Sequence, residues 1–272
     1  MIRLQSLFVT TAALMMFQNF AASADEPGKP SGEELYEVRH YLLSDDADPK
    51  RLDDYFRTAL VPALNRAGVE RVGVFTMPET LNADVPERMR GRRRMTLICV
   101  LDGFDELRSI DDKLDADATY QAAAATYWNR PNTEPLFDRI ETELLSAMDC
   151  QPQVRIDAET LNNDNRVYEF RLYESATERL AKKKVDMFNN GEVPIFLKTG
   201  VTPVFIGEAI VGPNRPSLSY LTVYDDDASR LAAWDRFRSD PDWKALSSDP
   251  QYANTVSKII KLVMRPTDYS QL

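Results

Sequence analysis

Apolar and polar residues alternate from position 36 to position 42, and segments with helical spacing follow. A period of two places successive side chains on opposite sides of an extended chain. We therefore predict a strand at 36–42. One side of this strand carries Tyr36, Val38, His40 and Leu42, and the other carries Glu37, Arg39 and Tyr41.

The stretch after this strand has the signals of a helix. Asp48 is placed to cap its start, and Pro49 suits its first turn. Apolar residues then recur at helical spacing as far as Leu64. We expect a helix that bends or restarts near Pro62 and is closed by Gly68.

The following segments complete one unit of six elements. The pattern predicts strands at 71–77 and 95–101, a mostly helical segment from 104 to about 128, and a last strand at about 137–148. A second set follows, with strands at 168–173, 204–211, 218–224 and 256–264 and a first helix at 177–189. Its second helix carries Leu231, Trp234 and Phe237 on one side.

The two sets also share sequence in one fixed register. Tyr36-Glu37-Val38-Arg39-His40-Tyr41 returns as Tyr168-Glu169-Phe170-Arg171-Leu172-Tyr173. In the same register Val61-Pro62 recurs as Val193-Pro194, and Gly68-Val69 recurs as Gly200-Val201. Self-similarity of this kind indicates a tandem repeat. We predict a first unit at 33–150, a polar linker at 151–165 and a second unit at 166–272.

Each unit reads as βαββαβ, the ferredoxin-like arrangement, so the fold class is α+β. A four-stranded sheet with both helices on one face leaves its other face bare. Two units in one chain can cover these faces mutually. The result is an eight-stranded barrel with the helices outside, which is the dimeric α/β-barrel arrangement within one chain.

Four stretches of the second unit resemble successive signatures of the NIPSNAP family. They are Tyr168-Glu-Phe-Arg-Leu-Tyr173, Val193-Pro-Ile-Phe-Leu-Lys-Thr-Gly200, Ala233-Trp-Asp-Arg-Phe237 with Ser239-Asp-Pro-Asp-Trp243, and Met264-Arg-Pro-Thr-Asp-Tyr269. In the first unit Asp117-Ala118-Thr119-Tyr120 stands where Asp-Pro-Asp-Trp would be. The resemblance implies a dimeric α/β-barrel fold made of tandem NIPSNAP domains, and it supplies no catalytic mechanism.

The N-terminus has the pattern of a secretory signal. Arg3 precedes an apolar run from Leu7 to Phe20, and Ala22-Ser23-Ala24 offers small residues for cleavage. We predict a signal peptide at 1–24 and an exported protein, periplasmic or secreted. An uncleaved anchor is the alternative. A membrane-spanning helix needs about twenty apolar residues, so we expect no span once the signal is removed.

Charge and cysteine content narrow the functional classes. A net charge of −10 argues against general affinity for nucleic acid. The arginines between positions 88 and 94 are a local exception, and a solvated loop and an anion site are both open. Cys99 and Cys150 can form a disulfide in an exported chain, but Cys99 lies in an apolar run where a buried thiol is equally reasonable.

Two polar trios are the candidate binding residues. Strand alternation gathers each trio on one side, and we predict that this side points into the barrel. Arginines and carboxylates in a closed interior must form ion pairs or meet a small polar ligand. The candidates are Glu37, Arg39, Tyr41, Glu169, Arg171 and Tyr173.

Standard catalytic signatures are few. The one histidine, His40, reads as a packed or helix-facing residue, so we predict no metal site, and no motif indicates a cofactor. The acidic runs at 45–48 and 225–227 lack the spacing of a calcium loop and suit helix capping. Trp234, Phe237 and Trp243 have the spacing of core residues.

Two functional hypotheses remain open, and neither decides whether the protein is an enzyme. The first is a barrel that binds a small molecule, with a cofactor-independent oxygenase or isomerase as its catalytic form. The second is a non-catalytic module that makes protein contacts at the cell envelope. A pocket in the barrel favours the first, and a filled interior favours the second. The assembly is expected to be a monomer with an intramolecular barrel or a higher homo-oligomer.

Overall fold

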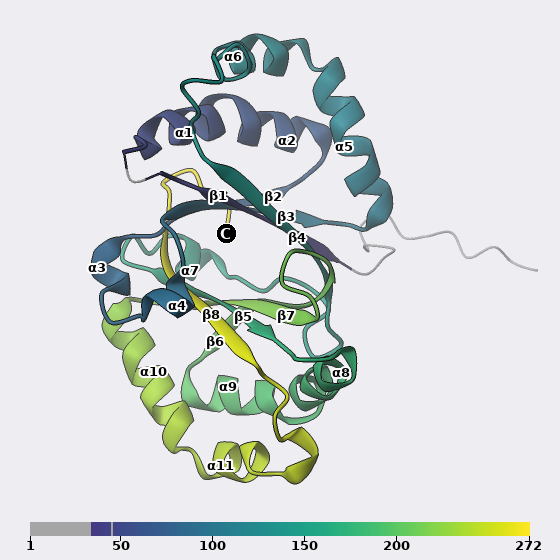
Figure 1. Ribbon diagram of the computed structural model, residues 1–272, viewed down its shortest axis with the longest axis vertical. Coiled ribbons are helices and arrows are strands. Elements are labelled where there is room, and N and C mark those ends of the chain that lie inside the picture. Colours follow the sequence, from purple (N-terminus) through teal and green to yellow (C-terminus); the bar gives the residue numbers. More distant parts are fainter. Residues whose placement is uncertain (1–33, 45) are drawn as a thin grey trace, which may run out of the picture. The chain divides into compact units, whose positions relative to one another are not determined.

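Eight antiparallel strands close into one barrel in the computed structural model, which describes residues 34–44 and 46–272 (Figure 1). The strand order around the barrel is β1-β3-β2-β8-β5-β7-β6-β4. The eight-stranded α+β barrel predicted from the sequence is therefore confirmed. The strands are β1 Leu35–Leu42, β2 Arg71–Thr76, β3 Arg94–Leu101, β4 Arg139–Ala147, β5 Val167–Glu174, β6 Thr202–Val211, β7 Ser217–Tyr224 and β8 Lys258–Pro266.

Helices cover the barrel in two layers on opposite sides (Figure 1). One layer contains α1 Pro49–Tyr55, η1 Phe56–Leu60, α2 Val61–Ala67, α5 Phe104–Ala116 and α6 Ala118–Trp128. The other contains α8 Glu178–Met187, η2 Phe188–Glu192, α9 Val193–Thr199, α10 Asp227–Ser239, α11 Pro241–Ser247 and η3 Pro250–Tyr252. Short helices α3 Glu79–Asn82, α4 Glu87–Arg90 and α7 Ala158–Leu161 lie in the links.

The two halves follow the same order of elements, and each has its first helix interrupted at the same place. Asp48 caps α1 by accepting a hydrogen bond from the Lys50 amide, 3.0 Å long. A π-helical turn then separates α1 from α2, and an equivalent turn, η2, separates α8 from α9. The expected interruption near Pro62 is thus a π turn just before it. The shared order is what a duplication requires, and the duplication itself stays a prediction.

The segment from 104 to about 128, predicted to be mostly helical, forms two helices. Asp117 ends α5 and caps α6, accepting hydrogen bonds from the amides of Thr119 and Tyr120. Asp240 makes the same break between α10 and α11 by accepting from Asp242 and Trp243. A short capping side chain competes with the helical backbone, which is why the chain turns at each position.

Three apolar cores hold these layers together. One lies between the first helical layer and its strands, and one lies between the second layer and its strands. The third fills the barrel interior, where Tyr36 stacks on Phe205 with ring centres 4.4 Å apart and Phe75 meets Tyr168. Trp234 and Phe237 belong to the second-layer core and Trp243 packs against it, as predicted.

The segment 151–165 does more than connect the halves. The Val154 amide donates to the Glu34 carboxylate at 2.6 Å, and the Arg155 amide donates to the Val204 carbonyl at 2.8 Å. Val154 also packs into the barrel core. The predicted linker therefore closes part of the barrel.

Several predictions concern the N-terminus or the thiols. The signal peptide predicted at 1–24 lies outside the described residues. Within residues 34–44 and 46–272, no helix is long and apolar enough to cross a membrane. Cys99 and Cys150 are both free thiols, and Cys99 is buried in the first-layer core.

Candidate functional site

The two polar trios face the helical layers, so the prediction that they line the barrel interior is wrong. Tyr41 and Tyr173 belong to the two helix-facing cores. The interior is lined instead by their apolar neighbours on the same strands, including Tyr36, Val38 and Phe170. Both sides of β1 and β5 are buried, and in β5 the charged side faces the helices, where Glu169 finds Arg230 of α10 as a partner.

In the first half the trio is a compact ion pair. Arg39 donates from Nε and Nη2 to the two oxygens of Glu37, each 2.8 Å away. Burial lowers the pKa of Arg39, but the Glu37 carboxylate outweighs it and the net shift is upward. For Tyr41, in contrast, burial itself raises the pKa, to about 12. The Arg39 side chain keeps 21% of its surface exposed.

In the second half the trio joins a larger network. Glu169 is fully buried, accepts from Arg171 at 2.5 Å and accepts from Arg230 of α10 at 2.6 Å. Burial raises its pKa, but the cations, Arg171 first, lower it overall. The Arg171 guanidinium lies 3.6 Å from the ring centre of Trp234 and donates to the Tyr173 hydroxyl.

Both trios therefore contain the ion pairs that the sequence favoured. Their charges are matched by protein partners: the Glu37–Arg39 pair lies within β1, whereas the second trio ties β5 to α10 through Arg230. Whether any of the six side chains also binds a ligand stays a prediction.

A different set of polar residues lies at one mouth of the barrel. There a cavity of about 170 Å³ is bordered by side chains from five strands and one loop. Its polar lining comes mainly from His40, Arg94, Glu141, Glu143 and Lys258. Phe170, Leu172 and Ile260 supply apolar walls. A volume of this size holds a few waters or a small molecule.

Glu143 is the unusual member of this set. Its side chain is buried, and its hydrogen-bond partner is the Ser219 hydroxyl. This hydroxyl lies 3.1 and 3.2 Å from the two carboxylate oxygens. No cation forms an ion pair with it among the described residues. Burial raises the pKa of Glu143 to about 7, although the Ser219 hydrogen bond acts the other way.

His40 also faces this mouth. From the sequence it was predicted to be a packed or helix-facing residue. Its Nδ1 shares a 2.9 Å hydrogen bond with the Thr96 hydroxyl, and its ring meets the edge of Phe170. Burial, helped by the positive charge of Arg94, lowers the pKa of His40 well below its usual value. The imidazole is therefore neutral, and no described residue hydrogen-bonds its Nε2 atom.

The arginine-rich segment leads into β3, and its last arginine, Arg94, borders this cavity. Arg92 pairs with Asp138, and Arg93 donates to the carbonyls of Ser44 and Ala47. Arg94 is buried and donates to the carbonyls of Arg90 and Arg92. The expectation of a solvated loop is therefore only partly correct, because the C-terminal end of the loop is packed against the protein. Arg94 borders the cavity and, among the described residues, has no carboxylate within ion-pair distance.

The mouth combines a carboxyl group that titrates near neutrality with a neutral imidazole and a buried guanidinium. Such a set can donate to and accept from a small polar molecule, and Glu143 can exchange a proton with it. Sequence reasoning missed Glu143. The available signal was that Glu141 and Glu143 occupy alternate positions of one strand, but their side of the sheet was not known. Among the described residues, no His, Cys, Asp and Glu side chains gather in a group of three or more that could hold a metal ion.

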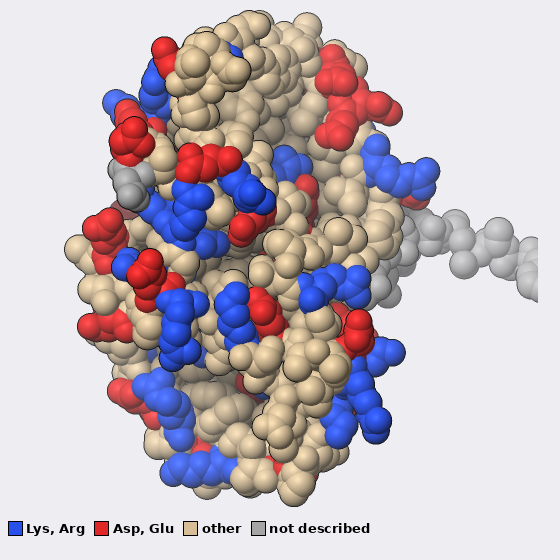
Figure 2. All heavy atoms as spheres, in the orientation of Figure 1, with Lys and Arg blue, Asp and Glu red and all other residues tan. Residues whose placement is uncertain are grey.

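Surface charge gives no second indication of a partner on the face that carries β8, α3 and α4. Figure 2 shows Lys and Arg interspersed there with Asp and Glu. This face has no broad patch of one sign, so charge alone does not select a macromolecular partner for it.

Comparison with known proteins adds a family and a fold. The sequence profile described as NIPSNAP matches residues 168–271. No curated protein matches the chain.

Solved structures resemble the chain at low identity. A candidate monooxygenase from Fusobacterium nucleatum is 12% identical with a TM-score of 0.53, covering 89% of this chain and 100% of that chain. One from Lactobacillus acidophilus is 11% identical with a TM-score of 0.51, covering 86% and 94%. A NIPSNAP family protein from Agrobacterium tumefaciens is 14% identical with a TM-score of 0.36, covering 39% and 98%. At these identities the likeness of the first two shows the α/β-barrel fold alone.

Proposed function

Because the chain belongs to the NIPSNAP family through its domain at residues 168–271, we propose that it is a barrel protein of that family which binds a small polar molecule at one mouth of the barrel. The ligand lies in the cavity beside Glu143 and His40. Arg94 and Lys258 border the same cavity, and their positive charges favour a polar or weakly acidic group there.

One observation carries this proposal: Glu143 is buried beside a cavity with a single hydroxyl as its partner. A buried carboxyl without a cation is costly, and a protein that needs only stability has an apolar residue at such a position. The second half supplies the comparison. Val38 pairs with Glu143 across β1 and β4, whereas Phe170, the counterpart of Val38 in the repeat, pairs with Leu262 across β5 and β8.

Ligand-induced stabilisation tests the proposal. Acetate, acetamide and phenol serve as probes, with the melting temperature as the readout. A probe at one hundred times its dissociation constant stabilises the fold by about 2.7 kcal/mol, or about 5–10 °C for a domain of this size. We expect Glu143→Gln to reduce the shift and Glu143→Leu to abolish it. Glu178→Gln, at an exposed position of α8, is the control and keeps the shift.

Two results contradict the proposal. Either none of the probes shifts the melting temperature, or the shift survives Glu143→Leu unchanged. If one probe binds, a proton-exchange experiment tests the catalytic form of the hypothesis. NMR follows the exchange of the acidic protons of the probe with deuterium in the presence of wild type and of Glu143→Gln. Exchange that is faster with wild type alone supports proton transfer by Glu143.

A protein-contact function is the second candidate, and the packed centre of the barrel favours it. Tyr36, Phe75, Tyr168 and Phe205 fill the middle of the interior, and the polar cavity occupies one end. A protein that binds none of the probes and elutes as a stable complex from the envelope fraction supports this candidate.

We also propose that the protein is exported and acts outside the cytoplasm. The proposal rests on the sequence pattern of residues 1–24. N-terminal sequencing of the exported fraction is expected to begin at or within a residue or two of Asp25. An intact Met1 in that fraction contradicts the signal peptide.

A further inference from the structure

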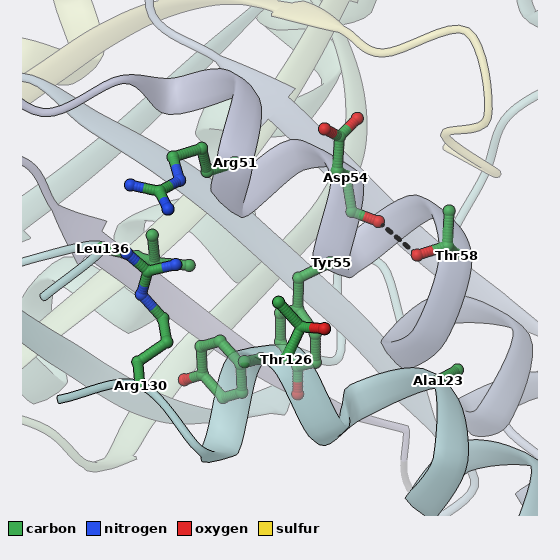
Figure 3. Close-up of a pocket in the computed structure, with 9 residues that line it drawn as sticks. Arg51, Asp54, Tyr55, Thr58, Ala123, Thr126, Arg130 and Leu136 are labelled. Carbon is green, nitrogen blue, oxygen red and sulfur yellow. Dashed lines mark hydrogen bonds between the residues drawn. The ribbon is translucent and has the colours of Figure 1, made fainter. Parts of the chain in front are cut away.

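The first helical layer contains a groove that is separate from the barrel mouth. It has a volume of about 260 Å³ and lies between α1 and η1 on one side and α6 on the other. The link after α6, including Arg130 and Leu136, closes one end. Figure 3 shows the side chains that line it.

A stacked aromatic pair joins the two sides of this groove, with Tyr55 on α1 and Tyr127 on α6. The rings of Tyr55 and Tyr127 are stacked with centres 3.8 Å apart and planes 7° from parallel. The Tyr55 hydroxyl also shares a 2.8 Å hydrogen bond with the Tyr120 hydroxyl, which fixes the pair from below. The inner faces of the two rings cover each other, so a planar ligand packs against an outer face or the edges of the pair.

The end of the groove near Leu136 carries two positive charges. Arg130 donates from Nε to the Glu134 carbonyl at 3.0 Å and pairs through Nη2 with the Glu134 carboxylate at 3.4 Å, so its guanidinium is held in place. Arg51 has no ion-pair partner among the described residues. Figure 3 shows both guanidinium groups at the Leu136 end, while the carboxylate of Asp54 points away from them. Glu134 balances part of the Arg130 charge, whereas Arg51 lacks a counter-charge, so a single anion beside the two guanidinium groups is favourable.

The same arginines also border an adjoining hollow that contains carboxylates. Asp46, Asp48, Glu134 and Asp138 line it together with Arg51 and Arg130. This acidic surrounding disfavours a ligand of high negative charge such as a phosphate dianion. A single negative charge is the best match.

The second half supplies an internal occupant at the corresponding place. When the halves are aligned on Tyr36 and Tyr168, Lys183 and Asp186 stand where Arg51 and Asp54 stand in the first half. The Lys183 ammonium donates to the Gln251 carbonyl at 2.9 Å, and the Tyr252 hydroxyl donates to Asp186 at 2.9 Å. The chain thus places its own aromatic residue and a carbonyl oxygen next to these two side chains. In the first half the link after α6 lies at one end of the groove, beside Arg51, and leaves the rest of the groove open.

We infer that the groove between α1 and α6 is a binding site for a small planar aromatic monocarboxylate, whose ring packs on the Tyr55–Tyr127 pair and whose carboxylate meets Arg51 and Arg130. The site is independent of Glu143 and of the barrel mouth. The two sites can therefore be tested separately.

Titration calorimetry with benzoate tests the inference, and benzamide is the neutral probe of the same shape. We expect benzoate to bind, and Arg51→Met or Arg130→Met to weaken it by about tenfold or more, because each removes a charge-assisted contact. Benzamide is expected to bind at least about tenfold more weakly than benzoate to wild type. Arg108→Met, at an exposed position of α5, is expected to leave benzoate binding unchanged.

A steric variant separates the groove from a general effect of charge. Ala123 lies on α6 in the lining, so Ala123→Trp fills the groove without changing any charge and is expected to abolish benzoate binding. Circular dichroism melting of each variant confirms that it is folded, and Arg51→Met remains informative if Arg130→Met is not. The inference is overturned if wild type does not bind benzoate, if benzamide binds equally well, or if Ala123→Trp binds benzoate as wild type does.

Discussion

The two halves of the barrel bury different chemistry at matching positions. In the first half Leu52 and Leu60 are buried apolar residues in α1 and η1. In the register that matches Tyr36 to Tyr168, the second half has Lys184 and Glu192 at these positions, and they form a buried ion pair 2.6 Å long. One backbone arrangement therefore accepts either an apolar pair or an ion pair. The ion pair fits because Lys184 also lies over the rings of Phe188 and Tyr173.

A second difference concerns the trios. Glu37 has one cationic partner, whereas Glu169 has Arg171, Arg230 and, at 4.0 Å, Lys261. The first half thus carries an isolated, partly exposed pair, and the second carries a buried network. The comparison teaches that the second half depends more on buried charge for its helix-to-sheet contacts. The variants below probe that dependence.

Separating the halves is the most disruptive way to break the comparison. Expression of residues 166–272 alone exposes the apolar side of β5, including Tyr168 and Phe170. We expect this half to dimerise or aggregate, because an exposed apolar sheet face seeks a partner. Analytical ultracentrifugation provides the measurement. A stable monomeric half contradicts the view that each half covers the other.

Breaking the Lys184–Glu192 pair gives the largest expected effect of a point substitution. Glu192→Gln leaves the buried Lys184 ammonium without its counter-charge and should lower the free energy of unfolding by about 3–5 kcal/mol. The double variant Lys184→Leu with Glu192→Leu copies the first half and should recover most of that loss. Urea unfolding of the three proteins decides. If the double variant is no more stable than Glu192→Gln, the halves are not interchangeable at this site.

Neutralising the two trio carboxylates compares the halves directly. Glu169→Gln strands Arg171 and Arg230 in a buried site and should cost about 3 kcal/mol. Glu37→Gln strands one partly exposed arginine and should cost about 1 kcal/mol. Both are measured by urea unfolding at one pH.

A double variant tests whether the loss of stability in the second trio comes from unpaired arginines. Arg171→Met with Glu169→Gln removes one ion pair, but it still leaves Arg230 without its Glu169 contact. We therefore expect partial recovery in this double variant. Full recovery indicates that the Asp227 carboxylate, 2.8 Å from Arg230, is a sufficient partner.

The pH dependence of stability tests a further difference between the halves. Glu143 occupies a position where the second half has Leu262, and its effect on the free energy of unfolding is expected to be smaller than that of Glu169→Gln. The pKa of Glu143 is raised to about 7, so the folded state holds this proton more tightly than the unfolded state. Stability from this group is full below the unfolded pKa, near 4.3, and is lost as the pH rises through about 7. We expect a loss of about 2–3 kcal/mol between pH 4.5 and 8, which Glu143→Gln removes. Equal pH slopes for wild type and the variant refute the shifted pKa.

The sequence predicted the fold well because its signals are local. Alternation marked the strand at 36–42, an apolar run marked the one at 95–101, and Asp48 marked a helix start. Gly68 and Gly200 end helices with left-handed backbone at φ 110° and 83°. The break at Asp117 was missed because Asp117 lies inside a continuous run of helix-forming residues.

The side of each strand that faces the interior could not be read from alternation. Both sides are buried, so the period of two leaves two equivalent choices. The choice depends on partners far along the chain, above all Arg230, which lies on a helix 61 residues after Glu169. The cavity was missed for the same reason. Its acid, Glu143, acquires its environment from Ser219, 76 residues away.

The barrel closes through two seams of unequal construction. The β4–β6 seam has four residue pairs, and Gly207 lets the strands approach closely, since a Cβ there would lie 2.7 Å from that of Leu145. The β2–β8 seam has two pairs, and the chain after β8 completes it, with the Thr267 and Gln271 amides donating to β2. Side chains of Ser270 and Gln271 accept the β2 amides of Val74 and Val72. In hydrogen exchange, the amides of Val72 and Val74 should therefore lose protection before those of the β4–β6 seam, which makes β2–β8 the place where the closed sheet first opens.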